Sequence, residues 1–205
     1  MLEVLGLNMD LQDGDLAARA NFCTIRDGVV TDRRAGRIAT EETVRLCAKI
    51  REALPRVEGV EVIISPGKSH RFALIFRGKG LSDHLTDGDP HKDNKPVRYA
   101  TPKDNDAEFA CRVVNTFMEN VMDLLKGEKV ANGALLRGFS TKPAIPPFAS
   151  NYGMKALALA TYPMYRGIAK VLGMDVKEEP RDYAEMVAML RNNYEAYQFF
   201  FLHIK

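Results

Sequence analysis

The chain has 205 residues, of which 46% are hydrophobic and 27% are charged. This composition excludes a disordered chain and is sufficient for one sizeable core. Lys and Arg number 29 against 27 Asp and Glu, a net charge of +2 at pH 7. So small a charge gives no general attraction to nucleic acid or to an anionic membrane, and neither is expected as a partner. Any anion binding must therefore be local.

The cysteines point to a reducing compartment. Cys23, Cys47 and Cys111 are odd in number, far apart and without metal-ligand spacing, which argues against a disulfide framework and against a structural zinc site. The N-terminus lacks the pattern of a secretory signal, and no stretch approaches the roughly 18 to 20 apolar residues of a membrane span. We expect a soluble, cytoplasmic protein.

The amino-terminal segment predicts a hairpin followed by a helix. Residues 16–31 are rich in β-forming residues and contain Asp27-Gly28, a pair that tolerates the positive φ angles of a two-residue turn. Apolar residues then recur at helical spacing from Thr40, the predicted N-cap, to Pro55. This helix is expected to cover one face of a sheet.

The middle of the chain predicts a second hairpin and a second helix with a long loop between them. Residues 60–65 and 71–77 read as strands on either side of a Pro-Gly turn. Residues 78–105 are rich in Gly, Pro, Asp and Lys, which is typical of either a long ordered loop or a mobile flap. A strong apolar stripe predicts a helix over 107–126.

The last third of the chain predicts a strand followed by a helix, as in α/β proteins. Residues 133–153 read as irregular because they include three prolines, and 156–160 read as a short buried strand. A helix to Gly173, another within 180–197 and a buried strand over 199–205 are predicted to follow. The chain ends in that apolar strand, which suggests a truncated protein.

These elements together predict an α+β (α/β) fold with a mixed or antiparallel sheet and helices packed on it. No repeat occurs, and no stretch of sequence has the composition of a linker between two independent domains. We therefore expect a single domain over residues 1–205.

The densest group of functional residues is DRRAGR, Asp32 to Arg37, directly after the first hairpin. Its guanidiniums suit bidentate binding of phosphate or carboxylate, and several desolvated together would need an anion to offset their repulsion. The alternative is a solvated turn in which Asp32 neutralises one arginine.

Two weaker signals lie further along the chain. His70-Arg71, at a strand start after the Pro-Gly turn, could hold a phosphate, although such a histidine is more often a capped surface residue. Asp87, Asp89 and His91 have metal-ligand types but no known metal spacing, so a turn held by aspartates is favoured. No catalytic nucleophile motif is present in the sequence.

Several segments, in this order, resemble the archaeal type of cofactor-independent phosphoglycerate mutase: GDLAARANFCTI, VTDRRAGRI, SHRFALIF, DGDPH, LLRGFS, YGMKALALATYPMYRGIAKVLGM and FFFLHIK. The resemblance covers nearly the whole chain. It implies an alkaline-phosphatase-like metalloenzyme of glycolysis and gluconeogenesis, of which this chain resembles the inserted, substrate-binding domain with short flanking pieces of the metal domain.

The resemblance implies a phosphoserine relay that interconverts 3-phosphoglycerate and 2-phosphoglycerate without 2,3-bisphosphoglycerate. Two divalent ions of the Mn, Mg or Zn type and the serine would lie in amino- and carboxy-terminal metal segments missing here, so no catalytic or metal residue is assigned and the chain alone is expected to be inactive. The resemblance assigns substrate contacts to Arg34, Arg37, His70 and Arg71, and less strongly to Arg19, Asn21, Asp32 and Arg137.

Two other functions are consistent with the residues. The chain could be the inserted domain of another metal-dependent phosphoryl- or phosphonate-transfer enzyme of the same superfamily, because fold likeness does not fix the substrate. It could also be a non-catalytic module that binds acidic groups of a protein or RNA through DRRAGR, although its near-zero net charge argues against this.

Overall fold

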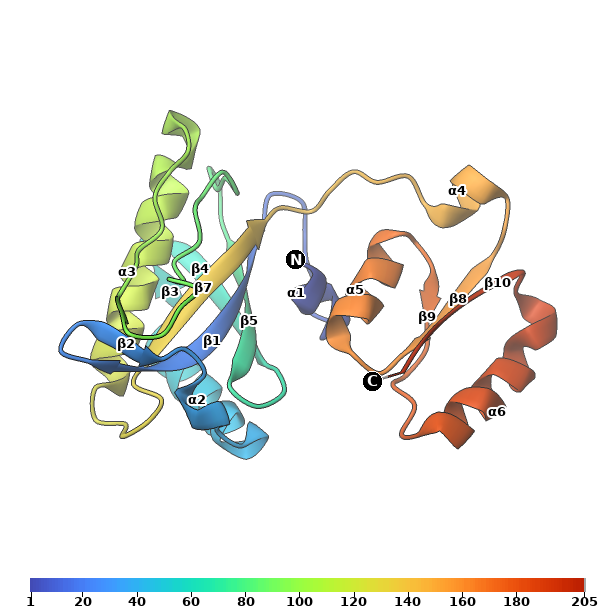
Figure 1. The fold of residues 1–205 in the computed structure, drawn as a ribbon. Coiled ribbons are helices and arrows are strands. Elements are labelled where there is room, and N and C mark those ends of the chain that lie inside the picture. Colours follow the sequence, from blue (N-terminus) through green and yellow to red (C-terminus); the bar gives the residue numbers. More distant parts are fainter. Residues whose placement is uncertain (205) are drawn as a thin grey trace. The chain divides into compact units, whose positions relative to one another are not determined.

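The computed structural model describes residues 1–204, which divide into two compact units (Figure 1). Unit 1 comprises Leu11–Lys142 with Met1, and unit 2 comprises Leu2–Asp10 and Pro143–Lys205. We predicted one domain with short flanking pieces. The second unit is larger than a flanking piece, because it has its own three-stranded sheet and its own hydrophobic cluster.

Unit 1 is built on a seven-stranded sheet in the order β3-β4-β5-β1-β2-β6, with β7 also paired to β1. Every pairing in it is antiparallel. Its strands are β1 (Leu16–Arg26), β2 (Val29–Asp32), β3 (Arg56–Val57), β4 (Val60–Pro66), β5 (Arg71–Arg77), β6 (Lys95–Pro96) and β7 (Gly133–Ser140). Its helices are α2 (Thr40–Ala53), α3 (Glu108–Leu125) and the 3-10 helices Ala35–Arg37 and Asn105–Ala107. The two predicted hairpins and both predicted helices are confirmed.

Helices α2 and α3 pack on one face of this sheet, which we call the helix face (Figure 1). Alternate residues of β1, such as Ala20 and Phe22, enter this core with apolar residues of both helices. Phe22 stacks on Phe72 of β5, and Phe76 meets Phe117 of α3 edge to face. Because side chains of a strand alternate between faces, the residues between these core positions lie on the second face of the sheet.

Three local predictions for unit 1 need correction or completion. Residues 133–140, predicted to be irregular, form β7, which pairs with β1 along much of its length. Thr40 is the first residue of α2 and not its N-cap; its hydroxyl accepts a hydrogen bond from the Ser69 amide. Segment 78–105, predicted to be a loop or a flap, contains the short strand β6 and is hydrogen-bonded to its surroundings, for example by the Gly88 amide donating to the Leu136 carbonyl at 2.8 Å.

Unit 2 contains a parallel sheet in the order β10-β8-β9. Its elements are α1 (Leu2–Gly6), α4 (Phe148–Tyr152), β8 (Ala156–Ala160), α5 (Pro163–Val171), β9 (Asp175–Val176), α6 (Tyr183–Asn193), the 3-10 helix Tyr194–Ala196 and β10 (Phe199–His203). Strand β8 is buried throughout, as predicted, and Leu157 and Leu159 pack on Met186 of α6. Strand β10 exists as predicted, but it is only partly buried. The mixed α+β class is confirmed.

Helices α1 and α5 cross so closely that glycine is required at the crossing. A Cβ atom built on Gly167 would lie 2.0 Å from the carbonyl oxygen of Leu2, and one on Gly6 would lie 1.8 Å from that of Pro163. Both distances are far below van der Waals contact, so any side chain here must displace a backbone segment. Across residues 1–204, no helix is both long and apolar enough to cross a membrane.

Candidate functional site: an arginine pocket

Strand pairing places four polar side chains together on the second face of the unit 1 sheet. In β1, Arg19 and Asn21 occupy positions between core residues. Arg19 pairs with Arg137 of β7, and Asn21 pairs with Arg71 of β5. Directly paired residues of antiparallel strands have Cβ atoms about 5 Å apart. Three neighbouring strands therefore bring three guanidiniums and one amide into a single patch.

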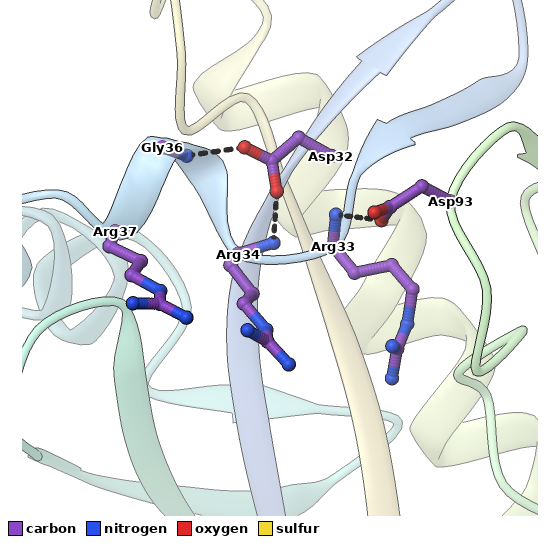
Figure 2. Close-up of a pocket in the computed structure, with 6 residues that line it drawn as sticks. All are labelled: Asp32, Arg33, Arg34, Gly36, Arg37 and Asp93. Carbon is purple, nitrogen blue, oxygen red and sulfur yellow. Dashed lines mark hydrogen bonds between the residues drawn. The ribbon is translucent and has the colours of Figure 1, made fainter.

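The loop Asp32–Arg37 brings three more guanidiniums, which extend to the same side of the loop (Figure 2). Ala35, Gly36 and Arg37 all have positive φ, at 46°, 63° and 54°, a conformation that costs energy for residues other than glycine. The Asp32 carboxylate stabilises this turn, because it accepts hydrogen bonds from the amides of Arg34 at 2.7 Å and Gly36 at 2.6 Å. Because these partners are backbone amides, the structure does not support the alternative in which Asp32 neutralises an arginine side chain.

The patch and the loop enclose a pocket of about 250 Å³, the arginine pocket, whose lining residues are Arg19, Asn21, Arg33, Arg34, Arg37, His70, Arg71 and Arg137. Seven of the eight residues predicted to contact substrate line it. Asp32 does not; it lines an adjoining depression of about 500 Å³ on the loop, together with Arg33, Arg34, Gly36, Arg37 and Asp93 (Figure 2).

The arginine pocket carries a strong positive charge with little internal compensation. It is lined by six arginines and no carboxylate. Arg33 forms a salt bridge with the buried Asp89, whereas Arg34, Arg37 and Arg71 have no carboxylate partner among residues 1–204. Arg34 and Arg37 are exposed and the other four arginines are partly buried, so charges of one sign gathered here repel each other until an ion of opposite sign joins them. The pocket is therefore suited to an anion with more than one negative charge.

His70 is an uncharged residue of the pocket, and its position is fixed. Its Nδ1 lies 3.3 Å from the Ser69 hydroxyl, which donates to the carbonyl of Ile38. Its own carbonyl accepts from the Phe22 amide of β1. Burial lowers the pKa of His70 to about 4, helped by the charges of Arg71, Arg34, Arg19 and Arg37. The imidazole is therefore uncharged at neutral pH.

This shift predicts how His70 changes stability with pH. The unfolded chain binds a proton at His70 below about pH 6.5, and the folded chain does so only below about pH 4, so stability falls as pH falls between these values. Each pKa unit corresponds to about 1.4 kcal/mol. We expect His70→Gln to reduce this loss by on the order of 2–3 kcal/mol, measured by urea unfolding at pH 7 and pH 4. An equal loss in both proteins would contradict the assignment.

The Asp32 hydrogen bonds predict that Asp32→Ala loosens the loop and weakens anion binding. Because the two bonds hold the amides of Arg34 and Gly36, we expect inorganic phosphate to bind about tenfold more weakly. Asp13→Ala is the control, since the Asp13 side chain is 93% exposed and lies outside both pockets. Calorimetric titration of both variants checks the prediction, and equal affinities would contradict it.

Sequence reasoning missed two residues near the pocket. Arg33 lines it, although the substrate contacts predicted within DRRAGR are Asp32, Arg34 and Arg37. Asp89 is fully buried behind Arg33. The predicted turn at DGDPH is confirmed, because Asp89 accepts from the His91 amide at 2.9 Å. Within residues 1–204, no three His, Cys, Asp or Glu side chains are grouped so that they could hold a metal ion.

The fold and the pocket define the class: an α+β protein with an arginine-lined pocket on the face of a sheet opposite its helices. The chain belongs to the family of 2,3-bisphosphoglycerate-independent phosphoglycerate mutases, whose model matches residues 1–131. The predicted family membership is thus confirmed.

Named relatives and a solved structure agree with this family. The chain is 42% identical over 205 residues to a protein of a Thermotoga species, and 44% identical over 208 residues to one from Thermus thermophilus. Both are named "probable 2,3-bisphosphoglycerate-independent phosphoglycerate mutase", and each alignment covers all of this chain and 51% of the relative. The cofactor-independent phosphoglycerate mutase of Thermoplasma acidophilum superimposes with a TM-score of 0.70 at 32% identity, over all of this chain and 58% of that one. The chain thus spans about half the length of its curated relatives.

Proposed function

We propose that this chain is the substrate-binding part of a phosphoglycerate mutase and that the arginine pocket binds 3-phosphoglycerate and 2-phosphoglycerate. The observation that carries the proposal is the lining of the pocket: six arginines, a neutral histidine and no carboxylate. Both substrates carry a phosphate and a carboxylate, which are the groups that a guanidinium binds in bidentate geometry.

In this proposal the chain's residues bind and orient the substrate. Guanidiniums on three strands and on the loop can hold two anionic groups at once, which fixes the glycerate between them. The same positive charges stabilise the phosphoryl group during transfer, and a closed pocket keeps water away from a phosphorylated intermediate. The serine nucleophile and two divalent metal ions are assigned to other parts of the whole protein.

Calorimetric titration of the chain with 3-phosphoglycerate tests the proposal, with glycerate and inorganic phosphate as controls. Each control carries only one of the two anionic groups. We expect 3-phosphoglycerate to bind at least about tenfold more tightly than either, since a second charge-assisted contact adds about 1.5–3 kcal/mol. Equal affinity for 3-phosphoglycerate and inorganic phosphate would contradict it and favour a general anion site.

A further inference from the structure

We infer that Asp89 is a positioning residue of the arginine pocket, holding Arg33 and Arg137 in place without contacting the ligand itself. Asp89 does not line the pocket, and it is fully buried. Its two oxygens accept hydrogen bonds from Nε and a terminal nitrogen of Arg33, each at 2.7 Å. The Nε atom of Arg137 lies 3.8 Å from the same carboxylate.

The segment that carries Asp89 is attached on both sides of the pocket. Towards β7, the Asp87 carboxylate accepts from the Gly138 amide at 2.8 Å. Towards the loop, Asp93 accepts from the Arg33 amide at 2.9 Å (Figure 2). Segment 87–93 thus connects the strand that carries Arg137 with the loop that carries Arg33. A carboxylate held at this point hydrogen-bonds the Arg33 guanidinium and attracts the Arg137 guanidinium at ion-pair distance, so it sets the positions of the two relative to each other.

The charges around Asp89 agree with this role. Burial alone would raise the pKa of Asp89, but the hydrogen bonds from Arg33 and the His91 amide, with the charges of Arg33 and Arg137, lower it. The carboxylate is therefore ionised when the pocket is empty. It offsets repulsion among guanidiniums that would otherwise drive Arg33 and Arg137 apart.

The positioning role and the loss of one negative charge predict opposite effects of Asp89→Asn on the affinity for anions. Removing a negative charge beside the pocket would by itself tighten anion binding. Losing the fixed positions of Arg33 and Arg137 would weaken it, and most for a ligand that must reach two guanidinium groups at once. The second expectation rests on the proposed function, because it uses 3-phosphoglycerate as the two-point ligand.

The first experiment needs no ligand. In NMR spectra of the chain, we expect the Arg33 Nε proton to exchange with water on the order of tenfold more slowly than that of Arg34, because Arg33, unlike Arg34, is hydrogen-bonded to a buried carboxylate. Asp89→Asn should remove the difference, whereas Asp13→Asn, which changes an exposed carboxylate that does not line the pocket, should keep it. Equal exchange of Arg33 and Arg34 in the unaltered chain would overturn the inference, even if the variant does not fold.

The second experiment measures affinity. We expect Asp89→Asn to bind 3-phosphoglycerate about tenfold more weakly and inorganic phosphate less than about threefold more weakly. Unchanged or tighter binding of 3-phosphoglycerate, or an equal loss for both ligands, would overturn the positioning role. If the unaltered chain does not bind 3-phosphoglycerate, the proposed function fails, and the exchange experiment still decides the role of Asp89.

Discussion

Arg34→Ala is expected to weaken the binding of 3-phosphoglycerate by about tenfold to a hundredfold, since hydrogen bonds to charged groups contribute about 1.5–3 kcal/mol. The Arg34 guanidinium lines the arginine pocket and has no carboxylate partner in the described chain. The side chain is therefore available to an anion, and its loss should leave the fold intact. Calorimetry gives the affinity, and thermal unfolding shows that stability is unchanged.

Two further variants separate the charge of Arg34 from its geometry. Arg34→Lys keeps the charge but not the planar, bidentate group, so we expect an affinity between those of Arg34→Ala and the unaltered chain. Arg26→Ala removes an exposed arginine at the end of β1 that lies outside the pocket, and it should bind normally. If Arg26→Ala weakens binding as much as Arg34→Ala, net charge and not the pocket controls affinity.

Gly167→Ala is expected to destabilise unit 2 by on the order of 3 kcal/mol. The added methyl group would lie 2.0 Å from the backbone oxygen of Leu2, so α1 or α5 must move. A gain of about 1 kcal/mol in helix propensity offsets only part of this cost. Hydrogen exchange should show faster opening of α1 and α5 than of the unit 1 strands.

Gly127→Ala is the matched control for this prediction. Gly127 follows α3, has no atom within 4 Å of a built Cβ, and does not have positive φ. Its replacement should therefore change stability by less than about 0.5 kcal/mol. If Gly167→Ala were as stable as Gly127→Ala, the close crossing of α1 and α5 would be wrong.

The arginine residues could be found from the sequence because their types and spacing are informative by themselves. Three guanidiniums in DRRAGR indicate an anion site, and His70-Arg71 lies at the start of a predicted strand, directly after a Pro-Gly turn. Their convergence depends on pairing: Asn21 of β1 lies beside Arg71 only because β1 and β5 are neighbours in that register. Periodicity predicts a strand, but it does not say which strand will be its neighbour.

Strand β7 and the two supporting aspartates show what local sequence signals miss. Glycine weakens strand propensity, yet Gly133 begins β7, where a Cβ would lie 2.4 Å from the terminal methyl of Ile25 and that side chain would have to shift. Tertiary packing thus overrides local preference. Asp32 and Asp89 resemble ordinary turn residues in sequence, and only the folded chain shows that one supports the loop and the other holds Arg33.

NMR titration of the 205-residue chain with 3-phosphoglycerate tests the central claim most directly, because it locates the ligand without requiring turnover. We predict saturable shifts at the amides of Arg33, Arg34 and Arg37 and at the His70 ring, and no shifts of comparable size around α6. Shifts confined to other surfaces, or none at millimolar ligand, would contradict a phosphoglycerate site in the arginine pocket.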